Sequence, residues 1–277
     1  MKYLEAESLL NKSYVEIKPQ HDERGHVYIK EHWARYINLL ALLPPINRNT
    51  RLLEVGASIL SAHLHMTYGC QTTVVYHELE REWSARFSQL GITAFPVEMM
   101  RDPLPVKDDS FDLILFDEVM EHFPIHPAFV MRQLINKLAG PGELFFSVPN
   151  FATSEKRLRL LFGKNPQDIM DERFIYYAHH REPVMQECVR LVQECGGLVF
   201  FHKWLELNGD PGVVPFVKRH LFHLYRRRFH PLIHFLFPSM RRYIVIRAHK
   251  KSSYNNDKTA CLPPLSISAE FARKPVK

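Results

Sequence analysis

The chain has 277 residues, 46% of them hydrophobic, which suits one α/β domain with additions and a sizeable core. No apolar run is long enough to span a membrane, and the first residues include acids where a signal peptide would need basic and then apolar residues. The net charge of +6 is uneven: Pro211–Asn256 contains ten Lys and Arg and no Asp or Glu, which leaves 26 basic against 30 acidic residues elsewhere. We therefore expect a cytoplasmic protein that is neither exported nor a general nucleic-acid binder.

Hydrophobic periodicity predicts alternating helices and strands over most of the chain. Residues 1–27 are polar without a clear period and are expected to form a loop and a short helix, and the next expected helix, His32–Leu43, ends at two prolines. Seven strands are expected, at Arg51–Val55, Thr72–Tyr76, Ile92–Val97, Phe111–Phe116, Glu143–Val148, Leu198–Trp204 and Tyr243–Ala248. The helices expected between them are Ile59–Tyr68, one around Arg81–Leu90, Ala128–Leu138 and Val184–Cys195. This alternation is typical of an α/β protein with a parallel sheet.

The stretch Leu104–Asn150 carries the clearest of these signals. Two apolar strands bracket one helix, which predicts a βαβ unit with parallel strands buried on both faces. We expect this helix to stop at Ala139–Gly142, where glycine can adopt the left-handed cap and proline cannot continue a helix. Four ionisable residues follow the first strand of the unit: Asp117, Glu118, Glu121 and His122. Ligands bind beyond the carboxyl ends of parallel strands, so this edge is the predicted functional site.

The sequence LPVKDDSFDLILFDEVMEH, followed by PGELFFSVPN, resembles the middle of a class I S-adenosylmethionine-dependent methyltransferase. The similarity runs from about Arg51 to Ala248. It implies a Rossmann-like fold: a seven-stranded, mostly parallel sheet with helices on both faces and a carboxyl-terminal antiparallel strand that lies between its two predecessors. It also implies S-adenosylmethionine as the cofactor and a methylation reaction.

The resemblance places the first cofactor motif at Glu54-Val55-Gly56-Ala57-Ser58-Ile59-Leu60. Relatives have an acid, one residue and then G-x-G-x-G, whose glycines let the backbone approach the methionine part of the cofactor. Here only the first glycine is present, because Ser58 and Leu60 occupy the other two positions. Glu54, Gly56 and Ser58 are the predicted cofactor residues of this motif. A relative that no longer binds the cofactor is the alternative.

The remaining cofactor positions follow the next three strands. The resemblance assigns Glu78 to the ribose hydroxyls, with Glu80 in reserve, since two acceptor oxygens suit a diol. Glu98, or else Asp102, is expected to meet the adenine amino group. Beyond the fourth strand, the prediction adds two acids: Asp117 and Glu118.

Three histidines are candidates for the chemistry of methyl transfer. The transfer is an in-line displacement, so the protein mainly aligns donor and acceptor, but a hydroxyl acceptor must also lose a proton. A neutral imidazole suits that task, which makes His122 the leading general base, with His179 and His180 as alternatives. The latter two precede Arg181-Glu182 in a segment that resembles the H-x-R-E connection of a broad group of bacterial methyltransferases.

Glu118, Glu121 and His122 also raise the question of a metal ion. At i, i+3 and i+4 they would share one helix face, and two carboxylates with an imidazole can hold Mg²⁺ or Mn²⁺. This E-x-x-E-H cluster resembles metal-binding clusters of ubiquinone-pathway O-methyltransferases and of small-RNA 3′-terminal 2′-O-methyltransferases. In the latter a further histidine joins, a place that His179 or His180 could take. Because metal-free relatives share these letters, we predict no metal site and keep a divalent ion as the alternative.

Between the last two expected strands lies a basic insertion, at about residues 207–242. Apolar residues fall on one helical face of Phe216–Phe229, namely Val217, Leu221, Leu224 and Tyr225, and Arg and His continue along another. Leu232–Phe237 adds apolar surface. This pattern predicts an interfacial helix on an anionic membrane, hence a peripheral membrane location, with a lid over the sheet as the alternative.

These observations predict an S-adenosylmethionine-dependent methyltransferase that acts on an oxygen of a small-molecule, lipid-linked or sugar-derived acceptor. The alternatives are a catalytically inactive methyltransferase-like scaffold and an RNA 2′-O-methyltransferase, although no nucleic-acid partner is expected. The predicted organisation is an amino-terminal helical cap at residues 1–50, a methyltransferase domain at 51–250 that contains the insertion, and a disordered tail at 251–277.

Overall fold

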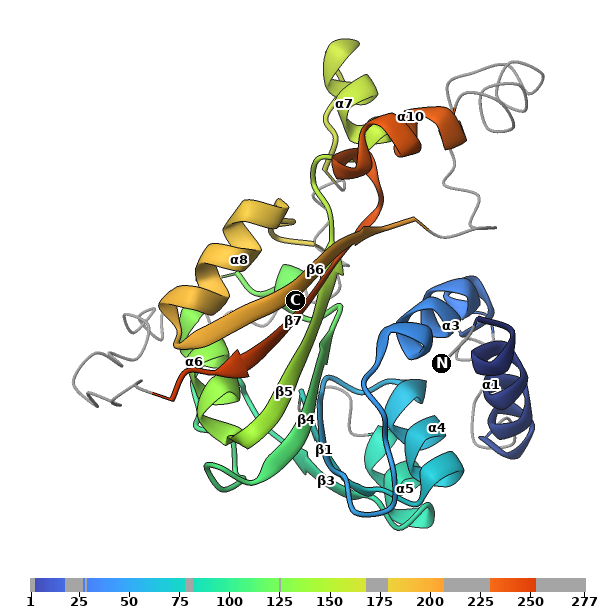
Figure 1. Ribbon diagram of the computed structural model, residues 1–277, viewed down its shortest axis with the longest axis vertical. Helices are drawn as coiled ribbons and strands as arrows, with labels where there is room; N and C mark the ends of the chain where they lie inside the picture. The colour runs from blue at the N-terminus through green and yellow to red at the C-terminus, as the bar shows by residue number, and fades with distance from the viewer. Residues whose placement is uncertain are drawn as a thin grey trace, which may run out of the picture.

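The computed structural model describes residues 3–17, 27, 29–77, 82–124, 126–167, 179–206 and 230–252. Its strands form one seven-stranded sheet in the order β3-β2-β1-β4-β5-β7-β6 (Figure 1). The strands are β1 Arg51–Val55, β2 Gln71–Tyr76, β3 Thr93–Pro96, β4 Phe111–Asp117, β5 Leu138–Pro149, β6 Gly197–Leu205 and β7 Tyr243–Lys250. Pairing is parallel from β3 to β5, whereas β7 runs antiparallel to both β5 and β6. The predicted sheet and the place of its last strand are confirmed.

Helices cover both faces of this sheet, as predicted. They are α1 Tyr3–Ile17, α3 Trp33–Leu42, α4 Ile59–Tyr68, α5 Glu82–Gln89, α6 Ala128–Lys137, α7 Ser154–Leu161, α8 Met185–Glu194 and α10 His230–Leu236, with short 3-10 turns η3 Met120–His122 and η6 Pro238–Met240. In Figure 1, α6 and α8 lie on one side of the sheet and α1, α3 and α4 on the other. None of the helices described has both the length and the apolar character that crossing a membrane requires.

The core is divided between the two faces because strand side chains alternate with a period of two. On β4, Ile114 and Phe116 pack on the side of α6 and α8, whereas Leu113 and Leu115 pack on the side of α3 and α4. This burial on both faces explains why the central strands are apolar runs rather than alternating sequences. By the same alternation Asp117, the last residue of β4, points to the side of α3.

The amino-terminal region is more regular than the sequence indicates. Helix α1 packs beside α3, with the rings of Tyr14 and Trp33 5.3 Å apart, and beside α4, where the Ser13 hydroxyl contacts the His63 ring. Among the α1 residues whose burial is described, the buried ones are Ala6, Leu10 and Ser13, spaced at i, i+4 and i+7. Small and polar members make that stripe hard to detect from hydrophobicity.

The predicted glycine cap of α6 is wrong. Helix α6 ends at Lys137 because Leu138 is already extended, and β5 begins there, so neither Gly140 nor Gly142 adopts the left-handed conformation. Gly142 is needed for another reason. A Cβ at this position would lie 2.5 Å from the carbonyl oxygen of Phe111, so glycine lets β5 approach the start of β4.

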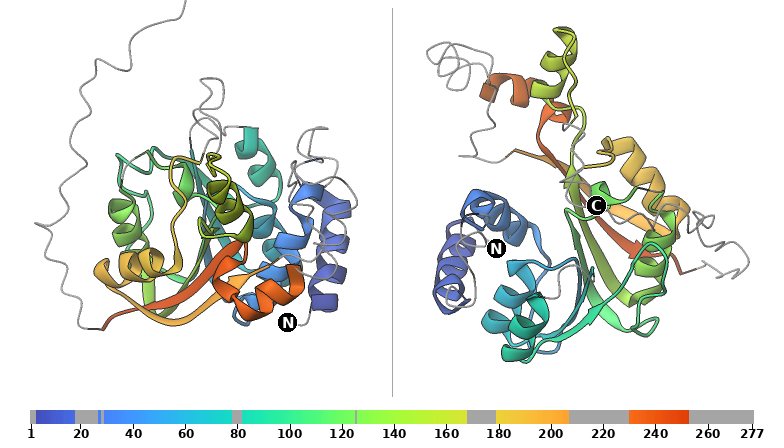
Figure 2. Two further views of the ribbon diagram at one scale, coloured as in Figure 1. Left: turned by 90° about the horizontal axis from the view of Figure 1, so that it is seen from above. Right: turned by 180° about the vertical axis from the view of Figure 1, so that it is seen from behind.

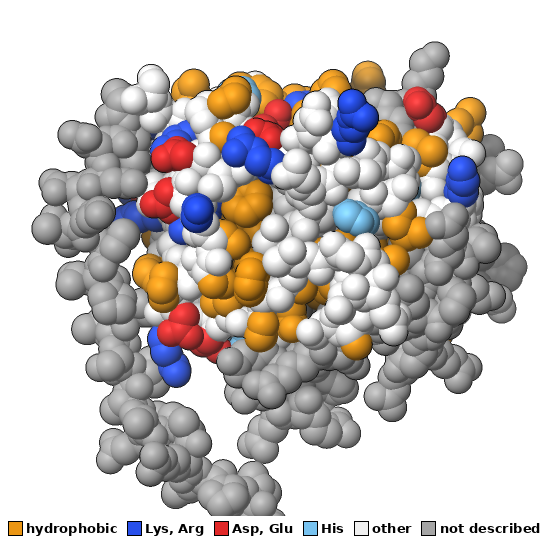
Figure 3. Space-filling view, turned by 90° about the horizontal axis from the view of Figure 1, so that it is seen from below, with side chains coloured by type: hydrophobic (Ala, Val, Ile, Leu, Met, Phe, Trp, Pro, Cys, Tyr) orange, Lys and Arg blue, Asp and Glu red, His pale blue; other side chains and the backbone are white. Residues whose placement is uncertain are grey.

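Helices α7 and α10 lie away from the central strands. Helices α7 and α10 lie together beyond one end of the sheet, joined by Ser154 Oγ and His234 Nε2 at 3.1 Å (Figures 1 and 2). The face seen from below carries acidic and basic side chains intermixed with hydrophobic ones among the residues drawn in colour (Figure 3). Most of the predicted insertion (residues 207–229), the tail from residue 253, and Glu78 and Glu80 lie outside the described residues.

Candidate active site

The carboxyl ends of β1 and β4 lie side by side and bring the predicted acids together. The register pairs Val55 with Phe116, so the residues after each strand emerge at one edge of the sheet. Gly56 turns the chain out of β1 with φ +96°, and its amide donates to the Val75 carbonyl oxygen at 2.8 Å. A Cβ on Gly56 would lie 2.6 Å from Cγ2 of Val119, so only glycine allows this close approach of the two loops.

Ser58 and Leu60, which replace the family's other two glycines, have defined places in the fold. Ser58 is the N-cap of α4: its hydroxyl oxygen accepts from the Leu60 amide at 3.0 Å and its hydroxyl donates to Glu54 Oε1. The Leu60 side chain is buried in the core between α4 and the sheet. The serine therefore orients the acid of the motif, and the leucine points into the core.

Buried carboxyl groups gather at this edge. Burial raises the pKa of Glu54 to about 8, although the hydrogen bond from Ser58 acts against it. Burial also raises the pKa of Asp117, against the nearby Arg35 charge, and the Asp117 carboxylate accepts a hydrogen bond from Ser147 on β5. The pKa of Glu118 is raised well above its ordinary value by burial and then by the charge of Glu121.

Arg35, on α3, faces two of these acids and was not predicted as a site residue. Its guanidinium lies 3.3 Å from Glu118 Oε2 and 3.9 Å from Asp117 Oδ2, and its side chain is almost fully buried. The sequence signal for Arg35 was weak. Leu39, one helical turn later, is buried as well, so Arg35 and Leu39 form a second buried row on α3 beside the predicted apolar stripe.

This charge pattern fits S-adenosylmethionine, whose sulfonium and ammonium groups are cationic. Three carboxyl groups, those of Glu54, Asp117 and Glu118, lie at the ends of β1 and β4, and the one arginine described there, Arg35, faces Asp117 and Glu118. Ionised carboxylates are costly to bury without partners, so a cationic ligand is favoured there. The charge of Asp117 contributes to the raised pKa of Glu54, so these two acids interact across the edge that β1 and β4 share.

The predicted adenine residues lie after β3. Glu98 Oε2 is 3.0 Å from Nε2 of His77, which follows β2, so the ends of β2 and β3 are joined through these side chains. Asp102 is exposed, and its carbonyl oxygen contacts the Gln133 amide. Of the two candidates, Glu98 is the one directed toward the neighbouring strand end.

Glu121, His122 and His179 form a second group beside the first. Glu121 is fully buried, and burial raises its pKa to about 8. Its Oε1 lies 3.9 Å from Nε2 of His122 and 4.0 Å from Nε2 of His179, and the two imidazole rings are 5.1 Å apart. The structure thus brings Glu121 and His122, which follow β4, close to His179, the first histidine of the H-x-R-E segment.

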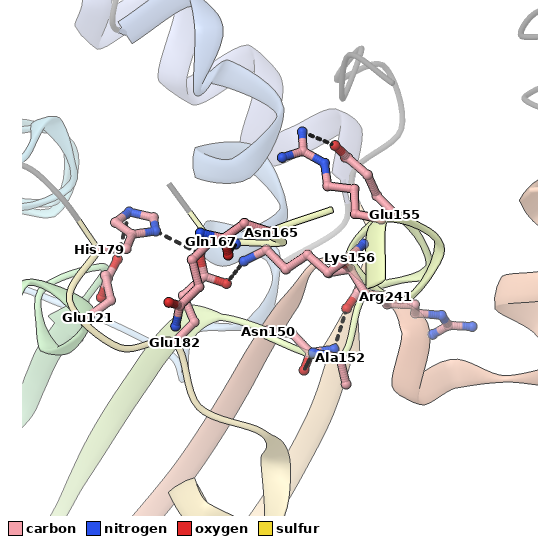
Figure 4. Close-up of polar contacts among 12 residues, drawn as sticks. Glu121, Asn150, Ala152, Glu155, Lys156, Asn165, Gln167, His179, Glu182 and Arg241 are labelled. Carbon is pink, nitrogen blue, oxygen red and sulfur yellow. Dashed lines mark hydrogen bonds and ion pairs between the residues drawn. The ribbon is translucent and has the colours of Figure 1, made fainter. Parts of the chain in front are cut away.

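His180 contributes its backbone rather than its ring. Its amide donates to the Glu121 carbonyl oxygen at 2.8 Å, and its side chain is exposed. His179 is instead held from behind: its Nδ1 lies 2.9 Å from Glu182 Oε1, and Lys156 pairs with the other oxygen of Glu182 (Figure 4). His179 is therefore the better placed of the two candidates.

The expected helix face of Glu118, Glu121 and His122 does not form. Glu118 is left-handed, with φ +53°, and only Met120–His122 make a 3-10 turn. Glu118 turns toward Arg35 on α3, and its attraction to that buried cation replaces helical geometry. The two carboxylates of the E-x-x-E-H cluster consequently belong to different groups.

A buried sheet edge with this topology and these acids defines a Rossmann-like methyltransferase fold. The methyltransferase-domain family matches residues 26–196, more than half of the chain, and the chain belongs to that family. It is an S-adenosylmethionine-dependent methyltransferase, with S-adenosylmethionine as its cofactor. No curated protein matches the chain.

Solved structures agree on the fold. A chain from the complex of the Haloferax volcanii methyltransferase activator Trm112 with a methyltransferase has a TM-score of 0.59 at 13% identity, covering 84% of this chain and 95% of that one. An S-adenosylmethionine-dependent methyltransferase from Thermotoga maritima has a TM-score of 0.51 at 15% identity, with 82% and 94% covered. One from Mesorhizobium loti has a TM-score of 0.50 at 16% identity, with 78% and 98% covered. At these identities the likeness concerns the fold alone.

Proposed function

We propose that this methyltransferase transfers its methyl group to a hydroxyl oxygen of a small-molecule, sugar-derived or lipid-linked acceptor. The supporting observation is the group of Glu121, His122 and His179 beside the acids of the cofactor edge. A hydroxyl acceptor must lose its proton as the oxygen attacks the methyl carbon, and imidazoles are suited to assist that loss near neutral pH. A carbon or nitrogen acceptor would need less of this help.

In this proposal Glu54, Gly56, Ser58, Glu78, Glu98, Asp117 and Glu118 bind the cofactor. Gly56 gives the methionine part close access to the backbone, and Glu54 and Asp117 face its positive groups. Glu78 holds the ribose hydroxyls. The oxygen attacks the methyl carbon, the bond from that carbon to sulfur breaks, and S-adenosylhomocysteine leaves with the acceptor proton released at the histidine group.

A labelling experiment tests the type of acceptor. The protein is incubated with S-adenosylmethionine carrying a ¹³C-methyl group and with water-soluble and organic-solvent fractions of a cell extract. The carbon chemical shift of any new signal separates O-methyl from N-methyl and C-methyl products. An O-methyl signal that His122→Ala abolishes and the surface variant His202→Ala retains supports the proposal. A labelled N-methyl or C-methyl product contradicts it.

The surface around α7 and α10 favours an amphiphilic acceptor and contact with an anionic membrane. Large apolar side chains are exposed on both helices and just after them: Leu160, Leu161, Phe162, Leu232, Phe235, Leu236 and Phe237. Leu161 and Phe235 are 77% and 76% exposed. Such a concentration of apolar surface beside basic residues is what an interfacial membrane contact needs.

Vesicle co-sedimentation tests the membrane contact. We expect binding that requires anionic lipid, weakens with salt, and falls when Leu161 and Phe235 become serine or when Arg226, Arg227 and Arg228 become glutamate. The triple arginine change concerns residues outside the described part, whereas the serine changes act on the exposed helices. Wild-type protein that ignores anionic vesicles at low salt would make the acceptor a water-soluble molecule. Neither the inactive scaffold nor the RNA methyltransferase is favoured by an observation of this structure.

A further inference from the structure

We propose that Glu121, His122 and His179 form a binding site for one divalent transition-metal ion. The inference deepens the proposed function, because it rests on the acceptor hydroxyl reaching this group, yet ion binding is measurable without any acceptor. The three residues come from two separate segments, one after β4 and one between β5 and α8. Their donor atoms all lie within 4.8 Å of one another.

The spacing of the donor atoms leaves room for an ion. Two atoms bonded to one ion at about 2.1 Å lie roughly 3 to 4 Å apart. Glu121 Oε1 lies 3.9 Å from His122 Nε2 and 4.0 Å from His179 Nε2, at the outer end of that spacing. Both distances are too long for a direct hydrogen bond. The carboxylate oxygen and the two nitrogens therefore converge on a gap that an intervening atom would fill.

Glu121 gives an independent reason for a cation in that gap. Its carboxylate is fully buried, and within the described part of the chain neither of its oxygens accepts a hydrogen bond. A buried carboxylate without a partner is strongly disfavoured unless a cation or a proton compensates it. The positive charge of Arg35 also reaches Glu121, but the ion pairs of its guanidinium are with Asp117 and Glu118.

The surroundings fix His179 in the orientation that a ligand needs. Glu182 Oε1 lies 2.9 Å from Nδ1 of His179, and Lys156 pairs with the second oxygen of Glu182 (Figure 4). A carboxylate that accepts from Nδ1–H places the lone pair on Nε2, an arrangement common behind metal-bound histidines. The His180 and Arg181 amides donate to the Glu121 carbonyl oxygen at 2.8 and 3.3 Å, which holds the two segments in register.

The donor set indicates which ions would bind. Glu118 is turned away, so the site offers two nitrogens and one carboxylate, unlike the two carboxylates and one imidazole expected from the sequence. Two imidazoles with one carboxylate suit Zn²⁺, Co²⁺ or Mn²⁺ better than Mg²⁺, which prefers oxygen ligands. Ligands from the described residues fill three positions, and a water molecule or an acceptor hydroxyl can take another.

Ion binding changes the role of His122 at this site. If its Nε2 is a ligand, His122 cannot also act as the general base that the sequence predicts. An ion held by Glu121, His122 and His179 would lower the pKa of an acceptor hydroxyl, whose proton would pass to solvent as the oxygen is methylated. The carbon–sulfur bond breaks as before, and no oxidant or reductant is needed.

Metal titration of the full chain tests the proposal. The protein is purified without a histidine tag, treated with EDTA and dialysed. It is then titrated separately with ZnCl₂, CoCl₂, MnCl₂ and MgCl₂, and the bound metal is counted by mass spectrometry. We expect one Zn²⁺ or Co²⁺ per chain, weaker Mn²⁺ binding and still weaker Mg²⁺ binding. Cobalt adds an absorption spectrum that reports coordination by nitrogen and oxygen.

Variants separate a metal site from surface adsorption. Glu121→Gln and His179→Ala should weaken Zn²⁺ binding by more than about 100-fold, and Glu182→Gln, which releases only the orientation of His179, by about 10- to 100-fold. His202→Ala, an exposed histidine on β6, should bind as wild type. Circular dichroism shows whether each variant is folded, and Glu182→Gln keeps the test decisive if a ligand variant unfolds.

The outcomes distinguish this inference from the proposed function. A wild-type chain that binds S-adenosylmethionine but neither Zn²⁺ nor Co²⁺ at a hundredfold excess overturns the metal site and restores His122 as the candidate general base. Equal loss of Zn²⁺ binding in His202→Ala and His179→Ala also overturns it. A chain that binds Zn²⁺ through these residues but not S-adenosylmethionine keeps the metal site and refutes the proposed function.

Discussion

Replacing Gly56 by alanine tests why the first motif keeps its single glycine. Gly56 has φ +96°, a conformation that costs an L-residue roughly 1–2 kcal/mol. The new Cβ would also lie 2.6 Å from Cγ2 of Val119, a clash worth about 1–3 kcal/mol when the surroundings must shift. We therefore expect Gly56→Ala to lower the free energy of unfolding by roughly 2–5 kcal/mol.

Two further variants separate the two costs. Val119→Ala removes the clashing methyl group, so in that background Gly56→Ala should cost only the roughly 1–2 kcal/mol of backbone strain. Gly91→Ala is the matched control: Gly91 has φ +74° and nothing within 4 Å of a built Cβ, so it should show backbone strain alone. Urea denaturation followed by circular dichroism gives the free energy of unfolding of the wild type, of the three single variants and of the Gly56→Ala/Val119→Ala double variant. Additivity of Gly56→Ala and Val119→Ala within about 0.5 kcal/mol would refute the close approach of the two loops.

Two further predictions concern buried titrating groups. The folded pKa of Glu54 is raised from 4.5 to about 8, so the folded state keeps a proton that the unfolded state loses, and stability should fall as pH rises from about 4.5 to about 8. The whole fall in the free energy of unfolding is worth roughly 5 kcal/mol, and Glu54→Gln should remove it in urea denaturation at a series of pH values. An unchanged dependence of stability on pH would contradict the burial of this carboxyl. Burial lowers the pKa of His63 from 6.5 to about 4, so the unfolded state takes up the proton first and stability should fall as pH drops from about 6.5 to about 4. His63→Gln should remove roughly 3 kcal/mol of that acid sensitivity, and a variant as acid-sensitive as wild type would show that another group titrates.

The sheet could be predicted because its signals are local. Runs of β-branched and aromatic residues define the strands, and the bounds of β1 and α4 agree with the structure to the residue. The position of β7 between β5 and β6 came from the family resemblance, since no residue pattern encodes strand order. Helix α1 was expected only as a short helix, because the buried residues described on it, Ala6, Leu10 and Ser13, are mostly small or polar.

The site was harder to predict because it depends on contacts between distant segments. Glu118 and Glu121 are three residues apart, yet a left-handed Glu118 sends one carboxyl group to Arg35 and leaves the other near His122 and His179. The periodicity of the sequence does not predict this turn, because the partner of Glu118 is a buried arginine on a helix more than 80 residues earlier. The choice between His179 and His180 likewise depends on Glu182 and Lys156, which hold one ring and not its neighbour.

The organisation into a helical cap, a methyltransferase domain with an insertion, and a tail stays a prediction. Within the described residues, α1 and α3 pack against one another, and α1 packs against α4. We propose that the cap at residues 1–50 completes the cofactor edge, since Arg35 on α3 faces Asp117 and Glu118. Removal of the cap should therefore weaken cofactor binding as well as stability.

Calorimetric titration with S-adenosylmethionine tests most directly whether this edge of the sheet holds the cofactor. We expect one binding site per chain in the wild type and in His202→Ala, with weaker binding in Gly56→Arg, whose side chain would enter the space beside Val119, and in Glu78→Ala. Binding should also tighten as pH rises toward 8, because Glu54 must release its proton to face the cationic ligand. Absence of binding by the wild type at millimolar ligand, or binding that Gly56→Arg leaves unchanged, would contradict the assignment of this site.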